Sequence, residues 1–170
     1  GKIIVTGPFY EIGGQTRSNI ARLNSDGTLD PTFSTPNFGS GTSAVYDVAV
    51  QNDGRILMIG VFNTVNGEVR ESVARLQPNG SLDATFASTM ATVGTAEVHV
   101  VRLDPSERIL LGGNFTEING IGADHLVRLN NGNADPCTLT TNPAMINIPG
   151  AGGAGNFQVL TGPNCAWAAT

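Results

Sequence analysis

The stretch that decides the fold is GKIIVTGPFYEIGG at residues 1–14, because it returns twice further along the chain. It reappears as GRILMIGVFNTVNG at residues 54–67 and as ERILLGGNFTEING at residues 107–120. The copies start at residues 1, 54 and 107, so each follows the last at a spacing of 53 residues without insertion or deletion. Such regular self-similarity is typical of repeat architectures, in which every copy is one supersecondary unit.

Each copy continues with further matching elements. The sequences IARL, VARL and LVRL end at Leu23, Leu76 and Leu129. DGTLDPTF from Asp26 matches NGSLDATF from Asn79, whereas the third copy degrades to NGNADPC, one residue out of register. The repeat therefore extends over nearly the whole unit.

The local pattern within a copy is that of short antiparallel strands. Apolar and polar residues alternate with a period of two, and Asp-Gly and Asn-Gly pairs mark tight hairpin turns. We expect four strands per unit, which in the second copy cover residues 45–51, 55–62, 72–76 and 81–86. A four-stranded unit of this length fits a β-propeller blade. A linear β-solenoid is the alternative.

The composition changes towards the C-terminal end. Both cysteines, the only tryptophan and the glycine-rich GAGGAG lie after residue 133. We therefore expect an all-β chain with two parts, propeller-type repeats over residues 1–133 and part of a different β module over residues 134–170.

The motifs GKIIVTGPFYEIGG, ARLNSDGTLDPTF and VYDVAVQNDG together resemble the delta-60 repeat family of large secreted bacterial proteins. That resemblance implies β-propeller blades, a secreted or cell-surface location and no catalytic residues. The tail resembles the opening strands of BACON-like modules, immunoglobulin-like domains linked to carbohydrate or mucin binding. This second match rests on the glycine-rich segment and on Cys165-x-Trp167.

Charge and hydropathy exclude two classes of partner. The formal charge of −5 and the pI of about 4.8 disfavour binding to a nucleic-acid backbone. No run of 18 apolar residues exists, so we expect no membrane span.

Most charged residues recur at fixed repeat positions. One arginine position is shared by Arg22, Arg75 and Arg128, and one carboxylate position by Asp30 and Asp83. A catalytic arginine is needed once, whereas an architectural one is needed in every blade. We therefore expect structural ion pairs that repeat from copy to copy, and no catalytic residue.

Three aromatic residues break the register of the repeat, namely Tyr10, Phe38 and Trp167. We expect them to be surface contacts. The only histidines are His99 and His125, and His99 takes the position of Tyr46 on the face of an inner strand that we expect to be buried.

Two other strings suggest ligands but are better explained otherwise. NSDGTLD at residues 24–30 offers too few oxygen ligands for a calcium loop and fits a hairpin turn. GAGGAG matches a dinucleotide fingerprint only as a string, because no strand–helix context surrounds it. We expect no metal and no cofactor.

The two cysteines, Cys137 and Cys165, are expected to form a disulfide. Two buried free cysteines are the alternative.

These observations favour a non-enzymatic extracellular repeat protein acting in adhesion, binding or structural display. The alternative is a structural subunit of a larger extracellular assembly or filament, and a propeller hydrolase is the least favoured. The chain holds one whole copy of the repeat and two incomplete ones, which is fewer than the four or more blades of a closed propeller. We expect further blades of a parent protein, or neighbouring copies, to complete the open strand edges, and a carbohydrate is one candidate ligand.

Overall fold

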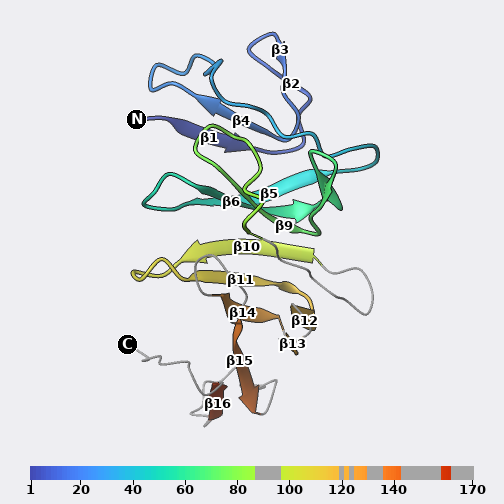
Figure 1. Cartoon of the computed structure of the whole chain (residues 1–170), viewed down its shortest axis with the longest axis vertical. Helices are drawn as coiled ribbons and strands as arrows, with labels where there is room; N and C mark the ends of the chain where they lie inside the picture. Colours follow the sequence, from blue (N-terminus) through green and yellow to red (C-terminus); the bar gives the residue numbers. More distant parts are fainter. Residues whose placement is uncertain (87–96, 119–120, 123–124, 130–135, 143–157, 162–170) are drawn as a thin grey trace, which may run out of the picture.

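The computed structural model describes residues 1–86, 97–118, 121–122, 125–129, 136–142 and 158–161. For residues 121–122, 136–142 and 158–161 it describes the backbone but not the side chains. Three antiparallel sheets stack along the long axis (Figure 1). The regular elements of this part of the chain are strands, and no helix in it is long and apolar enough to cross a membrane. The all-β, propeller-type fold expected from the sequence is confirmed.

Each sheet belongs to one copy of the repeat, and we call the sheets blades 1, 2 and 3. Blade 1 contains β1 (Ile3–Thr6) and β4 (Ile20–Leu23). Blade 2 contains β5 (Ala44–Val50), β6 (Ile56–Val61) and β9 (Val73–Leu76). Blade 3 contains β10 (Glu97–Leu103), β11 (Ile109–Asn114), β14 (Leu126–Leu129), β15 (Pro136–Asn142) and β16 (Gln158–Thr161).

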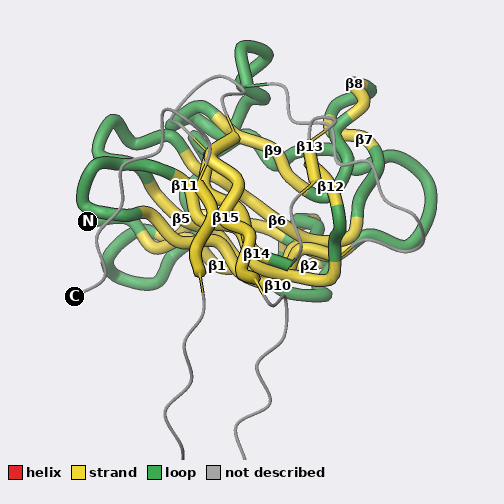
Figure 2. Tube along the Cα trace, turned by 90° about the horizontal axis from the view of Figure 1, so that it is seen from below, coloured by secondary structure: helices red, strands yellow, loops and turns green. Residues whose placement is uncertain are grey.

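A small hairpin projects from each blade between its second and third repeat strands. The three hairpins are β2–β3 (Glu11–Ile12, Gln15–Thr16), β7–β8 (Thr64–Val65, Glu68–Val69) and β12–β13 (Glu117–Ile118, Ile121–Gly122). Asn66 and Gly67 both have positive φ in the turn of β7–β8, as the Asn-Gly pair predicts. In Figure 2, β7–β8 and β12–β13 lie on the same side of the stacked blades.

The first strand of blade 2, β5, and the first strand of blade 3, β10, each carry a β-bulge at the same repeat position. We call these two strands the inner strands. The pairing of β5 with β6 shifts between Val45 and Asp47, and that of β10 with β11 shifts between Val98 and Val100. Tyr46 and His99 are the extra residues of these bulges. The expectation that this position is buried is wrong, because a bulge reverses the period-two alternation: Tyr46 is 45% exposed, and the two rings stack at 6.1 Å.

A glycine faces each bulge because a side chain would not fit there. A Cβ on Gly60 would lie 2.0 Å from the carbonyl oxygen of Ala44, and a Cβ on Gly113 would lie 2.1 Å from that of Glu97. Both glycines come from the same repeat position. The repeated glycine thus permits the close approach of the bulged inner strand.

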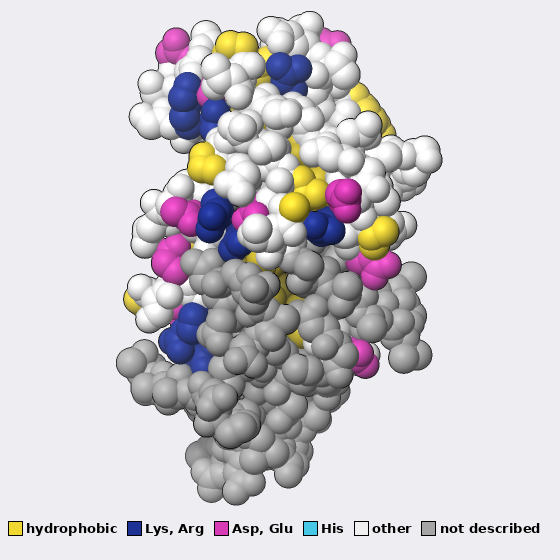
Figure 3. All heavy atoms as spheres, viewed as in Figure 1, with side chains coloured by type: hydrophobic (Ala, Val, Ile, Leu, Met, Phe, Trp, Pro, Cys, Tyr) yellow, Lys and Arg dark blue, Asp and Glu magenta, His cyan; other side chains and the backbone are white. Residues whose placement is uncertain are grey.

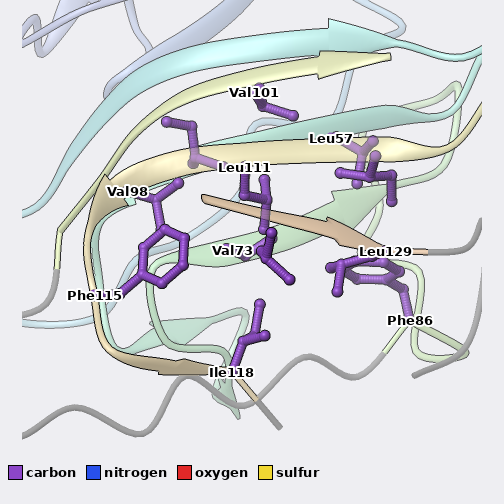
Figure 4. Close-up of a cluster of buried hydrophobic side chains, with 12 residues drawn as sticks. Leu57, Val73, Phe86, Val98, Val101, Leu111, Phe115, Ile118 and Leu129 are labelled. Carbon is purple, nitrogen blue, oxygen red and sulfur yellow. The ribbon is translucent and has the colours of Figure 1, made fainter. Parts of the chain in front are cut away.

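The core lies between the blades, so the middle strand of blade 2 is buried on both faces. Ile56 and Met58 pack in the cluster shared with blade 1, while Leu57 and Ile59 pack in the cluster shared with blade 3. Figure 4 shows the second cluster, where Leu57 and Val73 of blade 2 meet side chains of blade 3. Burying a side chain of this size contributes roughly 1.5–3 kcal/mol, so stacking stabilises the blades.

Each blade also places a non-glycine residue in the left-handed region just before its third repeat strand. These residues are Asn19, Ser72 and His125, with φ of 64°, 60° and 65°. Each donates its backbone N–H to the carbonyl of a phenylalanine that recurs in every copy, at 2.9–3.0 Å. The backbone path at this point is therefore the same in all three blades.

The fourth strand expected over residues 81–86 is reduced to an isolated bridge between Leu76 and Leu82. The chain turns away because one carboxylate oxygen of Asp83 accepts hydrogen bonds from the Thr85 backbone N–H (3.0 Å) and hydroxyl (2.6 Å). In blade 3 a full strand, β15, pairs with β14 at this place.

Several expectations concern the C-terminal part. β15 lies in the segment that we assign to a separate module, yet it continues the sheet of blade 3. Cys165 and Trp167 lie outside the described residues, as does the side chain of Cys137. The module boundary, the disulfide and the exposure of Trp167 stay predictions.

Candidate ligand-binding pocket

The repeated charges form ion pairs of the same geometry in blades 1 and 2. The Nε of Arg75 lies 2.8 Å from the Oδ2 of Asp83, and the Nε of Arg22 lies 2.8 Å from the Oδ2 of Asp30. Each guanidinium also covers a phenylalanine ring at 4.8–4.9 Å from its centroid. These interactions fix the outer part of each blade.

The two pairs differ in burial and in their second cation. The Arg75 and Asp83 side chains are 2% and 1% exposed, and Arg55 lies 3.6 Å from the same carboxylate oxygen. In blade 1, Lys2 takes the place of Arg55 at 3.0 Å from Asp30. Figure 3 shows basic side chains at the same edge of each of the three levels, on the left of the view.

Both carboxylates are held ionised. Hydrogen bonds from Thr32, and then those from Lys2 and Arg22, keep the pKa of Asp30 well below its usual range. Burial raises the pKa of the Asp83 carboxyl, but hydrogen bonds from Thr85 and the nearby Arg75 outweigh burial and lower it. Such fully engaged carboxylates serve as structural anions.

Arg128, the third member of the arginine set, is buried in β14 at the equivalent position. The carboxylate that would face it, Asp135 in the degraded third copy NGNADPC, lies outside the described part of the chain. Its expected ion pair stays a prediction.

The string NSDGTLD folds as the tight turn that its spacing predicts. The Asn24 backbone N–H donates to the Thr28 carbonyl at 2.8 Å, and the Asp26 carboxylate accepts from the Thr28 N–H and hydroxyl. In the described residues no group of three or more potential metal-ligating side chains comes together.

A pocket of about 260 Å³ lies beside blade 1, and most of its lining residues do not repeat, Arg17 being an exception. One wall is formed by the β2–β3 hairpin and the residues that follow it, and the other by the connection between blades 1 and 2. The lining residues are Tyr10, Thr16, Arg17, Ser18, Asn19, Thr35, Pro36, Asn37, Phe38, Gly39, Gly41 and Ser43. Of these, Tyr10, Ser18 and Asn19 correspond to different residue types in the second copy.

The connection that forms the second wall is fixed by hydrogen bonds to blades 1 and 2. Asn37 and Asn66 are joined twice, through Asn37 N–H to the Asn66 side chain (2.8 Å) and Asn66 N–H to the Asn37 carbonyl (2.7 Å). The Asn19 side-chain amide donates to the Ser43 hydroxyl across the pocket at 2.9 Å. The walls are thus positioned without a ligand.

Phe38 was expected at the surface, and that expectation is wrong. Its side chain is 7% exposed because its ring packs against Phe62, with centroids 5.5 Å apart, in the core between blades 1 and 2. It contributes an apolar base to the pocket. Tyr10, by contrast, is 78% exposed at the rim.

The polar groups of the pocket retain hydrogen-bonding capacity. Arg17 donates to the Thr16 carbonyl (2.8 Å) and the Gln15 side chain (3.3 Å), which leaves other N–H groups of its five-donor fork unused. The Thr35 hydroxyl oxygen is buried without a hydrogen-bond partner. Such a group favours a ligand that can supply the missing bond.

Comparison with protein families gives one match, to the model described as "domain of unknown function (DUF5122) beta-propeller", over residues 1–33, 51–86 and 107–136. The matched segments make up more than half of the chain. The chain belongs to this family. Curated proteins and solved structures give no match.

Each of the three segments matched by the DUF5122 β-propeller family falls in a different blade, and the match leaves out residues 34–50, which hold the connection between blades 1 and 2 and the strand β5. That interval contains half of the pocket wall, including Thr35, Asn37 and Phe38. The family match therefore covers the second and third repeat strands of every blade, while much of the pocket is built from residues outside it.

Our sequence reasoning missed Arg17, Thr35 and Asn37 as site residues. Arg17 gives no signal in the sequence because Arg70 repeats it in the second copy, and the polar connection carries no motif. The signal that could have found the pocket is the clustering of unrepeated residues, of which only the aromatic ones were singled out.

Proposed function

We propose that this chain is a non-enzymatic, extracellular repeat segment that binds a ligand in the pocket beside blade 1. The observation that supports this function most directly is where its two kinds of polar residue lie. The repeated Arg22–Asp30 and Arg75–Asp83 charges are engaged in ion pairs within the blades. The pocket is lined mostly by polar and aromatic residues that do not repeat, together with Arg17, whose counterpart Arg70 is buried. The ion pairs stabilise the blades, and the pocket lining supplies the groups for recognition.

Adhesion is the biological role that fits this arrangement. Propeller blades present loops on a rigid stack, so one blade can carry a recognition site without disturbing its neighbours. The exposed Tyr10 ring beside hydroxyl and amide groups suits a saccharide, which offers both apolar C–H faces and hydroxyl groups.

The test is an array of glycans probed with the whole chain and with Tyr10→Ala. We expect wild-type binding to a subset of glycans, loss of that binding in the variant, and bound glycans recovered with unchanged mass. Absence of wild-type binding, or conversion of a glycan to a product of different mass, would contradict the proposal.

A second function, assembly through strand addition, is favoured by the open edge of β1. β1 pairs with β4, and in the described residues no strand pairs with its other edge. Gly7 stands where Gly60 and Gly113 meet an inner-strand carbonyl, yet the atom nearest to a Cβ there is a Phe9 ring carbon at 3.7 Å. We propose that an inner strand from a further blade of the parent protein, or from a neighbouring copy, occupies this edge.

A peptide with the sequence of β5, AVYDVAV, extended by solubilising lysines, tests the edge. We expect it to bind to the chain and to protect the β1 amides from hydrogen exchange. A scrambled peptide of the same composition serves as the control, and equal protection by both peptides would argue against strand addition.

A further inference from the structure

We infer that the pocket beside blade 1 binds an acidic saccharide through the carboxylate of a hexuronic acid residue, an inference that rests on the binding function proposed above. The argument begins with charge. Arg17 is the one charged residue in the lining, although the chain as a whole carries a net charge of −5. A cation in a carboxylate-free pocket of an acidic protein selects for an anionic ligand.

Arg17 is equipped to bind a carboxylate in particular. Its two hydrogen bonds go to neutral acceptors of its own hairpin, Thr16 and Gln15, and no ion pair joins it to a carboxylate in the described part of the chain. These bonds orient the guanidinium while leaving its charge uncompensated. The planar fork of arginine matches the two oxygens of a carboxylate better than a lysine ammonium does.

The rest of the lining suits a sugar ring more than a simple anion. The Tyr10 ring at the rim offers a flat apolar surface, and Phe38 closes the base. The Asn37 carboxamide oxygen already accepts from the Gly39 N–H at 2.8 Å, which sets the orientation of its amide donor. Together with the unpartnered Thr35 hydroxyl, this amide can pair with ring hydroxyl groups.

The size of the pocket limits the ligand to a short segment. Its volume of about 260 Å³ is below the roughly 300–1,000 Å³ typical of sites for drug-sized molecules. One acidic ring can therefore enter, while flanking sugars would lie along the rim at Tyr10.

The second copy shows that this chemistry is specific to blade 1. At the equivalent positions Asn63 replaces Tyr10 and Glu71 replaces Ser18, so the aromatic surface is lost and a carboxylate is gained. Arg70, the counterpart of Arg17, is buried at 9% exposure. Blade 2 keeps the arginine position but not the set of groups that would accept an anion.

The experiment compares trigalacturonic acid with its methyl ester, which has the same rings but no charge, by calorimetric titration of the whole chain. We expect the acid to bind at least tenfold more tightly than the ester. Arg17→Gln should reduce acid binding to the level of the ester and leave ester binding unchanged. Tyr10→Ala should weaken both.

Two controls isolate the role of Arg17. Arg55→Gln removes an equal charge outside the pocket and should leave both affinities unchanged, and circular dichroism checks that each variant keeps the wild-type fold. Arg17→Lys keeps the charge without the fork and should give an intermediate affinity for the acid.

The outcomes separate this inference from the proposed function. Equal or tighter binding of the ester, or binding of neither probe, overturns the acidic-saccharide inference, while glycan binding that depends on Tyr10 would still uphold the proposed function. Full displacement of the acid by an equal concentration of acetate also overturns the inference, because it would show a site for any carboxylate.

Discussion

Replacing Arg75 by methionine tests whether the buried ion pair holds blade 2 together. The substitution keeps the length and the apolar stem of the side chain but removes its charge and its 2.8 Å hydrogen bond to Asp83. Asp83 is 1% exposed, so it would stay behind as a carboxylate without its closest cation. Breaking a buried pair in this way typically costs about 3–5 kcal/mol.

The structure places the expected cost at the lower end of that range. Arg55, with its Nε 3.6 Å from the same oxygen, still compensates part of the charge, and Thr85 keeps both hydrogen bonds to Asp83. We therefore expect Arg75→Met to lower the free energy of unfolding by about 3 kcal/mol. With an m value of roughly 1–3 kcal/mol/M, the urea midpoint would fall by about 1–3 M.

Urea unfolding followed by circular dichroism measures this change, and two further variants serve as comparisons. Arg102→Met removes an exposed ion pair with Asp47 and should cost only about 0–1 kcal/mol. In the double variant Arg75→Met, Asp83→Leu, no buried charge remains, so part of the lost stability should return. A loss below about 1 kcal/mol for Arg75→Met, or an equal loss for Arg102→Met, would refute the reasoning.

Three other changes have expected outcomes. Gly60→Ala forces a Cβ to within 2.0 Å of the Ala44 carbonyl oxygen, so we expect loss of the folded state in a thermal melt, and a wild-type melting temperature would show that the bulge can shift. Phe38→Ala should cost about 3–5 kcal/mol through the cavity it leaves, whereas Tyr10→Ala should change stability by less than about 0.5 kcal/mol. The folded-state pKa of Asp83 is depressed, so its contribution to folding stability is present above the unfolded pKa of about 3.9 and is lost as the pH falls through the folded value. Urea midpoints that do not decrease below about pH 4 would contradict this role of Asp83.

The repeat in the sequence was enough to predict the blades and the residues that pair within them. Arg22 and Asp30 recur as Arg75 and Asp83 at the same separation, and partners that recur together along a repeat occupy equivalent places in its fold. The fourth strand could not be predicted as reliably, since Asp83 ends the pairing through its own side-chain hydrogen bonds with Thr85.

Alternation along a strand fails as a guide wherever a bulge intervenes. Tyr46 and Val48 share a face if the strand is regular, but the extra residue places Tyr46 in contact with solvent. The pocket escaped prediction for another reason. Its walls come from residues 10–19 and 35–43, and only the folded connection between the blades brings the two segments together.

The left-handed residue that precedes the third repeat strand is a position where the three copies differ in side chain without differing in backbone. Asn19, Ser72 and His125 have nearly the same φ, yet their side chains are an amide, a hydroxyl and an imidazole. The three blades therefore share one backbone conformation at this position and differ in the side chain that it carries. In blade 1 that side chain spans the pocket, through the hydrogen bond of Asn19 to Ser43. In a tandem array of such blades, the side chain at this position can therefore change in one blade while the backbone of the stack stays the same.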